Sequence, residues 1–351
     1  MCGIAGFCNF KEDFEENTDY WNFRLEKMRA VLAHRGNDAR GRYLKKHIGL
    51  SHSRLAIRDI LCGDQPMTRT HNGYEYTICY NGEIYNTDEL IPELSENGFV
   101  CSTTSDTEVI LYAYIHWGAD FVNRLNGIFA FAIWDAAKNR LLLYRDRVGV
   151  KPLFYAIRGD SLVFGSEPKA CFAHPAVKPE LDKQGLQELL AIGPAHTSGL
   201  SLFKDLFEVL PGHFMIYSQN GLHDETYWEL TSREHTESYQ DTVAHTRFLV
   251  EDAIKRQMVS DVPVCTFLSG GIDSSIVTAI AANYMNTRGK TLNTFSFDFK
   301  DNDRYFKANA FQPERDLPYV NRMLEEYETA HSYLELSLIH ISEPTRPLYI
   351  S

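Results

Sequence analysis

A strand, a Gly/Ser-rich loop, a helix and a second strand follow one another in the last third of the chain, and this order constrains the fold most. Residues 262–268 are an apolar run, residues 269–275 read SGGIDSS, residues 276–285 have helical character, and residues 291–299 are β-prone. Strand–loop–helix–strand units build parallel, doubly wound sheets. The pattern therefore predicts an α/β domain at this end of the chain.

The loop at residues 269–275 has the composition of an anion-binding site. Its two glycines let backbone N–H groups approach an anion closely, its serine hydroxyls can donate further hydrogen bonds, and the following helix adds its dipole. The spacing of a P-loop, G-x-x-x-x-G-K-[ST], does not occur here. A turn whose serines only cap the helix is the alternative, but strand, loop and helix agree, which favours phosphate binding.

The N-terminal 210 or so residues have a different character and read as a β-rich α+β unit. A helix over residues 106–117 places its apolar residues on one face, and Ser105 or Asp106 can cap it. The pair Asn81-Gly82 reads as a turn that ends the β-prone run 76–80. Further helices are expected over residues 182–192 and 241–258, and further strands over residues 128–134, 140–144 and 214–217.

Composition narrows the class of protein. The 351 residues correspond to about two domains at ~150 residues each, and 44% of them are apolar, enough for sizeable cores. A net charge of −12 argues against nucleic-acid or anionic-membrane partners, and no run approaches the ~18–20 apolar residues of a membrane span. Seven scattered cysteines without C-x-x-C argue against disulfides and structural zinc. Since no signal peptide is evident either, we expect a cytoplasmic protein with reduced thiols and no metal site.

Cys2 is the first candidate for catalysis. A small second residue favours removal of Met1, which would make Cys2 the N-terminal residue. Such a cysteine combines a thiol nucleophile with an α-amine that titrates near ~7.7–8 and can act as its base. One residue is weak motif evidence on its own, and a chance occurrence is the alternative.

Cys2 opens a series of segments that resembles the class II glutamine amidotransferases. The segments are residues 2–6, 33–38, 51–57, 80–86, 105–108, 145–153 and 165–170. Their order along the chain makes joint chance occurrence negligible. The resemblance implies an α+β N-terminal-nucleophile fold, an αββα sandwich, that hydrolyses glutamine.

The resemblance also implies a role for individual residues. Cys2 would be the nucleophile, and the Asn81 side chain with the Gly82 N–H would form the oxyanion hole. Arg54 would hold the α-carboxylate of glutamine, because a guanidinium binds a carboxylate with two parallel hydrogen bonds. Asp106 and Glu83 would hold its α-ammonium. The implied glutamine-binding set is Arg54, Leu55, Ala56, Ile57, Arg58, Asn81, Gly82, Glu83 and Asp106.

Two histidines and one departure from the family pattern qualify this reading. His34 and His52 lie in the matching segments and could act as general bases, but the N-terminal amine already fills that role. Packing or hydrogen bonding near the pocket is the alternative for both. Asn37 replaces the proline that usually follows His-Arg-Gly, and we expect a change in loop stiffness there without loss of activity.

The Gly/Ser loop resembles the SGG-x-DS motif of the ATP pyrophosphatases, which activate a carboxylate as an acyl-adenylate. The resemblance implies ATP with Mg²⁺ as substrates and no tightly bound cofactor. Asp273 could approach that Mg²⁺ or cap the helix. The implied ATP-binding set is Leu268, Ser269, Gly270, Gly271, Asp273, Ser274, Ser275 and Phe297.

A glutaminase followed by an ATP pyrophosphatase domain resembles glutamine-dependent asparagine synthetase. That resemblance implies that ammonia released at Cys2 attacks β-aspartyl-AMP to give asparagine, AMP and pyrophosphate. It implies glutamine, aspartate and ATP as small-molecule partners, and it allows a homodimer. A β-lactam synthetase-like enzyme and a non-catalytic relative are the rivals. Amidotransferases with sugar-isomerase or phosphoribosyltransferase domains are disfavoured by the Gly/Ser loop.

The expected domains are an amidotransferase domain at residues 2–210, a connection at 211–240, the N-terminal part of a synthetase domain at 241–335, and a foreign tail at 336–351. Residues 336–346 do not continue the resemblance and are similar to a translated sequencing adapter, with a β-strand as the alternative. We therefore expect a truncated chain with a complete glutaminase site and half of an ATP site.

Overall fold

The computed structural model describes residues 1–193, 196–310 and 313–337. The chain divides into two compact units, Met1–Arg233 and a second unit that begins at Glu234. The expected foreign tail lies outside the described residues from position 338 onward. Within the described ranges, no helix is both long and apolar enough to cross a lipid bilayer.

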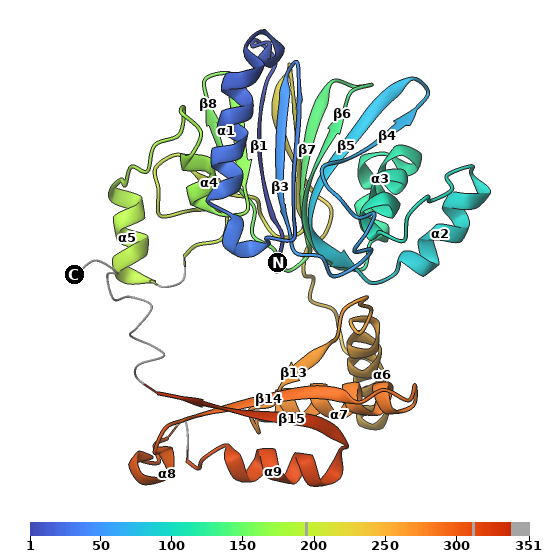
Figure 1. Ribbon diagram of the computed structural model, residues 1–351, viewed down its shortest axis with the longest axis vertical. Helices are drawn as coiled ribbons and strands as arrows, with labels where there is room; N and C mark the ends of the chain where they lie inside the picture. The colour runs from blue at the N-terminus through green and yellow to red at the C-terminus, as the bar shows by residue number, and fades with distance from the viewer. Residues whose placement is uncertain (194–195, 311–312, 338–351) are drawn as a thin grey trace. The chain divides into compact units, whose positions relative to one another are not determined.

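The first unit contains two six-stranded antiparallel sheets (Figure 1). The first sheet has the order β10-β8-β9-β1-β3-β2, and the second has the order β12-β11-β7-β6-β5-β4. The strands of the first are β1 (Gly3–Asn9), β2 (Ala39–Lys45), β3 (Ile48–Arg54), β8 (Phe154–Arg158), β9 (Ser161–Gly165) and β10 (Phe207–Glu208). Those of the second are β4 (Met67–His71), β5 (Tyr74–Ile84), β6 (Gly127–Asp135), β7 (Arg140–Arg145), β11 (His213–Ser218) and β12 (Gly221–Thr226).

Helices cover the outer face of each sheet, so the layers follow the order helix, sheet, sheet, helix (Figure 1). The first sheet packs against α1 (Thr18–Ala30) and α4 (Pro168–Phe172). The second packs against α2 (Thr87–Glu96) and α3 (Asp106–Trp117). The remaining helical elements of this unit are η1 (Phe14–Asn17), η2 (Ala33–Arg35), η3 (Ala119–Arg124) and α5 (Lys183–Ala191).

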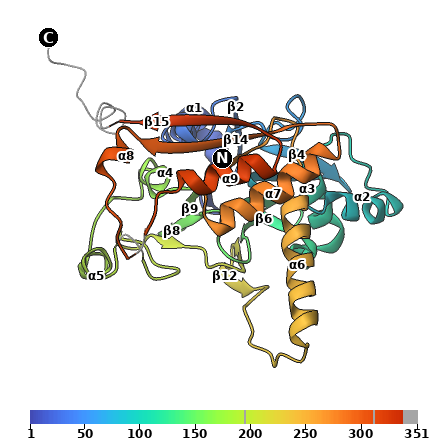
Figure 2. The same ribbon diagram turned by 90° about the horizontal axis from the view of Figure 1, so that it is seen from below.

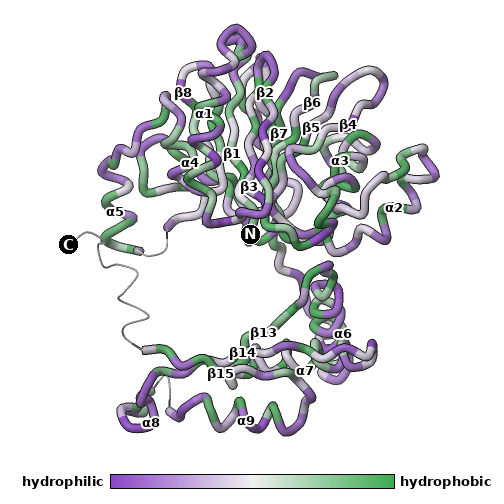
Figure 3. The backbone as a smooth tube through the Cα atoms, in the orientation of Figure 1, coloured by the Kyte–Doolittle hydropathy of each residue, from purple (hydrophilic) through white to green (hydrophobic). Residues whose placement is uncertain are grey.

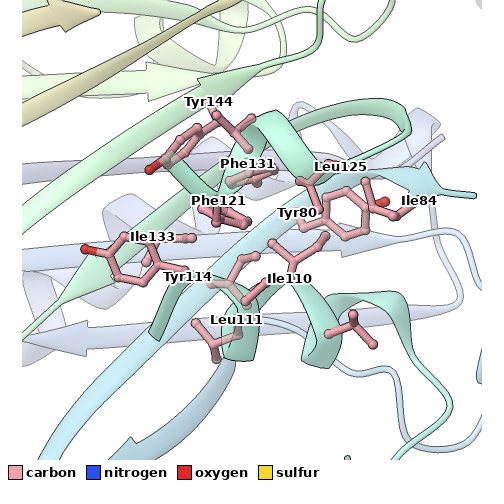
Figure 4. Close-up of a cluster of buried hydrophobic side chains, with 14 of the residues drawn as sticks. Tyr80, Ile84, Ile110, Leu111, Tyr114, Phe121, Leu125, Phe131, Ile133 and Tyr144 are labelled. Carbon is pink, nitrogen blue, oxygen red and sulfur yellow. The ribbon is translucent and has the colours of Figure 1, made fainter. Parts of the chain in front are cut away.

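The strand β6 shows why a sandwich of this kind needs apolar residues on both faces of a strand. Phe129, Phe131 and Ile133 face the helices, whereas Ala130 and Ala132 face the other sheet. Figure 4 shows Phe131 and Ile133 among the buried side chains on the helix side. Alternate residues of a strand point to opposite faces, so a strand covered on both sides reads as one continuous apolar run. Hydrophilic residues are prominent in the turns that connect the strands, for example at the end of the sandwich away from the N-terminus (Figure 3).

Several expected elements occur where the sequence predicts them, and one does not. The helix over 106–117 is α3, and the Ser105 side chain caps it by accepting a hydrogen bond from the Thr107 N–H. The turn predicted at Asn81-Gly82 is wrong, because β5 continues through this pair to Ile84. Close backbone packing explains the glycine: a Cβ on Gly82 would overlap the carbonyl oxygen of Ile128 in the neighbouring strand.

In its described residues, the second unit has a parallel three-stranded sheet of order β13-β14-β15, and β14 and β15 run side by side in both views (Figures 1 and 2). Its strands are β13 (Cys265–Phe267), β14 (Leu292–Phe299) and β15 (Thr329–Leu336). Its helices are α6 (Tyr239–Arg256), α7 (Ile272–Asn286), α8 (Asn302–Tyr305) and α9 (Leu317–Glu326).

The expected order of strand, loop, helix and strand is present, but two boundaries differ from the prediction. The buried strand predicted over 262–268 is confined to Cys265–Phe267, and Phe267 is 70% exposed. Pro263 has no backbone N–H for a sheet ladder, and only Thr266 of this short strand is buried. The helix begins at Ile272 instead of residue 276, so Ser274 lies in its first turn.

Candidate active site

A pocket next to the N-terminal end of β1 brings together most of the residues predicted to bind glutamine. Each sheet contributes to it, as do the loop after β3 and the start of α3. It is lined by Cys2, Arg54, Leu55, Ile57, Arg58, Gly63, Gln65, Tyr80, Gly82, Glu83, Ser105, Asp106 and Thr107. Of the predicted set, Ala56 and Asn81 do not line it.

The Cys2 thiol lies against the backbone of Leu55. Its Sγ is 3.4 Å from the Leu55 nitrogen, which donates to it, and 3.6 Å from the Leu55 carbonyl oxygen. Burial raises the pKa of the Cys2 thiol, and the hydrogen bond with Leu55 opposes that rise. The guanidinium of Arg35 donates from Nε to the Cys2 carbonyl oxygen at 2.8 Å, which fixes the backbone that carries the thiol.

Arg54 is buried, and its guanidinium holds the loop that follows β3. Nη1 donates to the Ile60 carbonyl at 3.1 Å and to Asp64 Oδ1 at 3.0 Å, and Nη2 donates to the carbonyls of Arg58 and Asp59. The fork that the sequence assigns to a substrate carboxylate is thus engaged with the protein. Asp64 is the exception among these partners, because its side chain is 75% exposed and can leave.

The pocket also contains a buried carboxylate, Asp106, at the start of α3. Its Oδ2 accepts hydrogen bonds from the Tyr80 hydroxyl at 2.9 Å and from the Ile84 N–H at 3.0 Å. Burial raises the pKa of Asp106, while the charge of Arg58 and these hydrogen bonds act in the opposite direction. Arg58 is itself held by the Ile84 carbonyl at 3.0 Å.

The side-chain amide of Asn81 contains a donor that no described residue accepts. The side chain is 1% exposed, and its Nδ2 has no hydrogen-bond partner within the described part of the chain. Buried amide groups nearly always find a partner, so an orphaned one points to a group that is supplied by a ligand. The neighbouring Gly82 faces the pocket with Cys2.

Neither histidine considered from the sequence lines the pocket. His52 is fully buried, its Nε2 lies 3.0 Å from the Tyr80 carbonyl, and burial lowers its pKa to about 4. It is therefore neutral at physiological pH. His34 is half exposed and bonds to Glu167 at 2.8 Å.

Three supporting residues were missed as site residues from the sequence. Arg35, which holds the Cys2 carbonyl, is paired with Glu167 at 2.9 Å. Asp38 accepts from the Ala56 N–H at 2.8 Å, and its own N–H donates to the Arg54 carbonyl at 2.9 Å. All three lie inside the segments that resemble the amidotransferases, but their partners are remote in sequence and no local pattern identifies them.

In the second unit, the Gly/Ser loop has hydrogen bonds that fix its shape. Ser269 Oγ and Ser274 Oγ are 2.9 Å apart, and Ser274 Oγ donates to the Gly271 carbonyl at 3.1 Å. Gly270 has φ = 80°, a left-handed conformation that favours glycine.

A pocket at this sheet edge brings together part of the predicted ATP-binding set. Its lining includes Leu268, Ser269 and Phe297, together with the aromatic rings of Phe267 and Phe295. The predicted residues Gly270, Gly271, Asp273, Ser274 and Ser275 belong to the loop and first helical turn and do not line it. Within residues 1–193, 196–310 and 313–337, no group of three or more His, Cys, Asp or Glu side chains could hold a metal.

Comparison with known proteins identifies the family of this chain. The family model described as "Glutamine amidotransferase domain" matches residues 1–228. The chain belongs to the glutamine amidotransferase family. A second family model, "Asparagine synthase", matches this amidotransferase over residues 245–345, which extends past the expected boundary at residue 335. The resemblance to glutamine-dependent asparagine synthetase is thereby confirmed.

Curated relatives of this amidotransferase carry related names. "Asparagine synthetase [glutamine-hydrolyzing] 3" of Bacillus subtilis is 48% identical over 94% of this chain and 53% of the relative. "Asparagine synthetase [glutamine-hydrolyzing] 1" of the same organism is 34% identical over 86% of this chain and 46% of the relative. "Amidase chyE" of Penicillium rubens is 34% identical over 81% and 43%. The chain thus spans about half the length of the curated relatives it matches.

Proposed function

We propose that this protein is a glutamine-hydrolysing asparagine synthetase, of which this chain holds the glutaminase site and part of the synthetase domain. One observation carries the proposal: a thiol, a guanidinium and a buried carboxylate, those of Cys2, Arg54 and Asp106, line a single pocket. Glutamine needs these three groups, because its amide must be attacked while its α-carboxylate and α-ammonium are held. The similarity to relatives named asparagine synthetases supports the same conclusion.

The proposed reaction begins with removal of Met1, since the nitrogen of Cys2 must be a free amine to act as a base. The amine takes the thiol proton, and Sγ attacks the amide carbon of glutamine. A base is required because burial raises the pKa of the Cys2 thiol. The amine then gives its proton to the departing nitrogen, ammonia leaves, and water hydrolyses the thioester to glutamate.

The tetrahedral intermediate carries a negative oxygen that needs donors. We assign these to the Asn81 amide and the Gly82 N–H, because Asn81 Nδ2 is buried without a partner in the described structure. A donor fixed before the reaction stabilises the developing charge without reorganisation. Exchange of Asp64 for the glutamine α-carboxylate would let Arg54 Nη1 donate one charge-assisted hydrogen bond to the substrate, while Nη2 stays on the carbonyls of Arg58 and Asp59.

For the second unit we propose an ATP site at the Gly/Ser loop. Ser269, Ser274 and the N-terminus of α7 would hold phosphates, and the apolar pocket beside Leu268 and Phe297 would take the adenine. Asp273 is exposed in the first turn of α7 and could approach Mg²⁺, which ATP brings largely through its own phosphates.

The fold and domain assignments follow from this proposal. The four layers of the first unit would be an N-terminal-nucleophile sandwich. Its expected end at residue 210 is too early, because β11 and β12 belong to the second sheet and extend it to Thr226. The connection expected at residues 211–240 would therefore begin after Thr226, and residues 241–335 would be the first part of a doubly wound ATP pyrophosphatase domain. A foreign tail at 336–351 remains a separate hypothesis, to be tested by reading the open reading frame from intact genomic DNA.

The acid that accepts the ammonia distinguishes the proposed function from a second candidate function. The competing function is that of another amidotransferase of the same architecture, the β-lactam synthetase-like enzyme considered from the sequence, whose acceptor would be a carboxylic acid other than aspartate. Incubation of the full-length protein with amide-¹⁵N glutamine, ATP and aspartate should yield ¹⁵N asparagine, AMP and pyrophosphate. Glutamate formation without asparagine, together with amidation of another acid, would favour the competitor. The 351-residue chain itself should hydrolyse glutamine and form no asparagine.

A further inference from the structure

The loop after β3 and the segment before α3 meet at one buried carboxylate, that of Asp59. Its Oδ2 accepts a hydrogen bond from the Thr104 N–H at 2.8 Å, and its Oδ1 accepts from the Cys62 N–H at 2.9 Å. Its backbone carbonyl accepts from Arg54 Nη2 at 2.5 Å. Asp59 therefore contacts the guanidinium of Arg54 on one side and the approach to Asp106 on the other.

The backbone of Asp59 has an unusual conformation. Its φ is 45°, in the left-handed region that Asp and Asn tolerate better than most residues. The side chain is 9% exposed, and the hydrogen bonds from Cys62 and Thr104 outweigh burial, so that the pKa of Asp59 is lowered. A strained backbone with a buried carboxylate beside a pocket is typical of a functional constraint.

We propose that Asp59 is a positioning residue for glutamine, whose carboxylate ties the loop that holds Arg54 to the segment that leads into Asp106. The proposal rests on the proposed glutaminase function. An amino acid carries its carboxylate and ammonium on one carbon, so their separation is fixed. Two protein groups that bind both ends must keep a matching separation, and here they belong to different elements. The hydrogen bond from Thr104 to Asp59 joins those elements.

The test uses Asp59→Gly and Asp59→Asn in the whole chain. Glycine accepts φ = 45° without strain, so Asp59→Gly relieves the backbone while it removes the carboxylate. Asparagine keeps the shape and one acceptor oxygen. We expect the KM for glutamine to rise at least about tenfold in the glycine variant and less in the asparagine variant, with kcat changed less than about threefold.

A purely structural role gives a different result, and Asp135→Asn provides the matched control. Asp135 is 1% exposed, belongs to β6 and accepts from the Tyr114 hydroxyl, outside the pocket. Asp135→Asn should lower the melting temperature and leave KM unchanged. An Asp59→Gly protein with the wild-type KM, or with KM and kcat reduced only in proportion to folded protein, would overturn the proposal.

Measurement of glutamine binding distinguishes the positioning role of Asp59 from the proposed glutaminase activity. In the Cys2→Ala background, calorimetry should give a dissociation constant for glutamine that rises about tenfold when Asp59→Gly is added. If wild-type protein hydrolyses no glutamine while this rise is observed, the glutaminase proposal fails and the role of Asp59 stands. Equal dissociation constants would refute the role of Asp59, and absence of binding by the Cys2→Ala protein would refute both.

Discussion

Replacement of Asn81 by alanine should separate activity from stability, because its amide donor is buried without a partner in the described structure. Loss of one oxyanion donor lowers kcat by about 10²–10³, or ~2.7–4 kcal/mol of barrier. An unpaired buried donor costs the folded state about 1–3 kcal/mol, so its removal offsets the packing lost with the side chain. We therefore expect the free energy of unfolding to change by less than about 1 kcal/mol.

Asn86 is the matched control for this prediction. It is also buried and follows the same strand, but its Nδ2 donates to the Arg124 carbonyl at 2.9 Å and its Oδ1 accepts from the Asn126 N–H at 2.8 Å. Asn86→Ala leaves both partners unpaired and should cost about 1–3 kcal/mol of stability. Its kcat should stay within a few-fold of wild type, since both polar atoms of its side chain are already engaged with Arg124 and Asn126.

The assay measures glutamate release at saturating glutamine and urea unfolding of the same preparations. We expect the two variants to differ in opposite respects: low kcat with normal stability for Asn81→Ala, and normal kcat with reduced stability for Asn86→Ala. An Asn81→Ala protein that keeps more than about a tenth of the wild-type kcat would refute the assignment of its amide to the oxyanion.

Three further changes test separate parts of the site. Asp64→Asn should lower the KM for glutamine up to about fivefold, because loss of an exposed ion pair worth ~0.2–1 kcal/mol frees Arg54 for the substrate. An unchanged KM would contradict the exchange of Asp64 for the substrate carboxylate. His52→Gln should keep glutaminase activity. The folded-state pKa of His52 is lowered to about 4, so the wild-type protein should lose stability as the pH falls from ~6.5 to about 4, and His52→Gln should remove this loss. Loss of glutamine hydrolysis in His52→Gln would restore the general-base interpretation. Gly36→Ala should destabilise the fold by about 1–3 kcal/mol and lower activity, since its Cβ would lie 2.5 Å from the Leu55 nitrogen; a wild-type melting temperature would show that the segment can move.

Local sequence patterns predicted the helix α3, which begins at Asp106 in the pocket, and the order of elements around the Gly/Ser loop. The helix α3 is rich in apolar residues and has a capping Ser105, and both signals are contained in a dozen residues. Such signals are weaker where tertiary contacts decide. Asn81-Gly82 resembles a turn, yet it lies in a strand because the neighbouring strand packs against a glycine.

In the candidate site, too, local motifs identify some residues and tertiary contacts alone identify others. Cys2, Arg54, Gly82 and Asp106 could be named from motifs, and the structure brings all four to one pocket. Supporting contacts could not be named, because they join distant positions: Asp59 and Thr104 are 45 residues apart. Arg35 and Glu167, another such pair, are 132 residues apart. Their partners are set by the sheets that bring these segments together, and a single sequence does not encode that proximity in any local pattern.

The central claim is that Cys2 is the nucleophile of a glutaminase, and amide hydrolysis by the Cys2→Ala protein tests it most directly. Ammonia release from amide-¹⁵N glutamine should fall to background in the Cys2→Ala protein, which should still bind glutamine. The control Cys265→Ala, which removes an exposed thiol of β13, should keep the wild-type rate. Mass spectrometry of the wild-type protein should show that Met1 has been removed. Hydrolysis by Cys2→Ala at the wild-type rate would contradict the account.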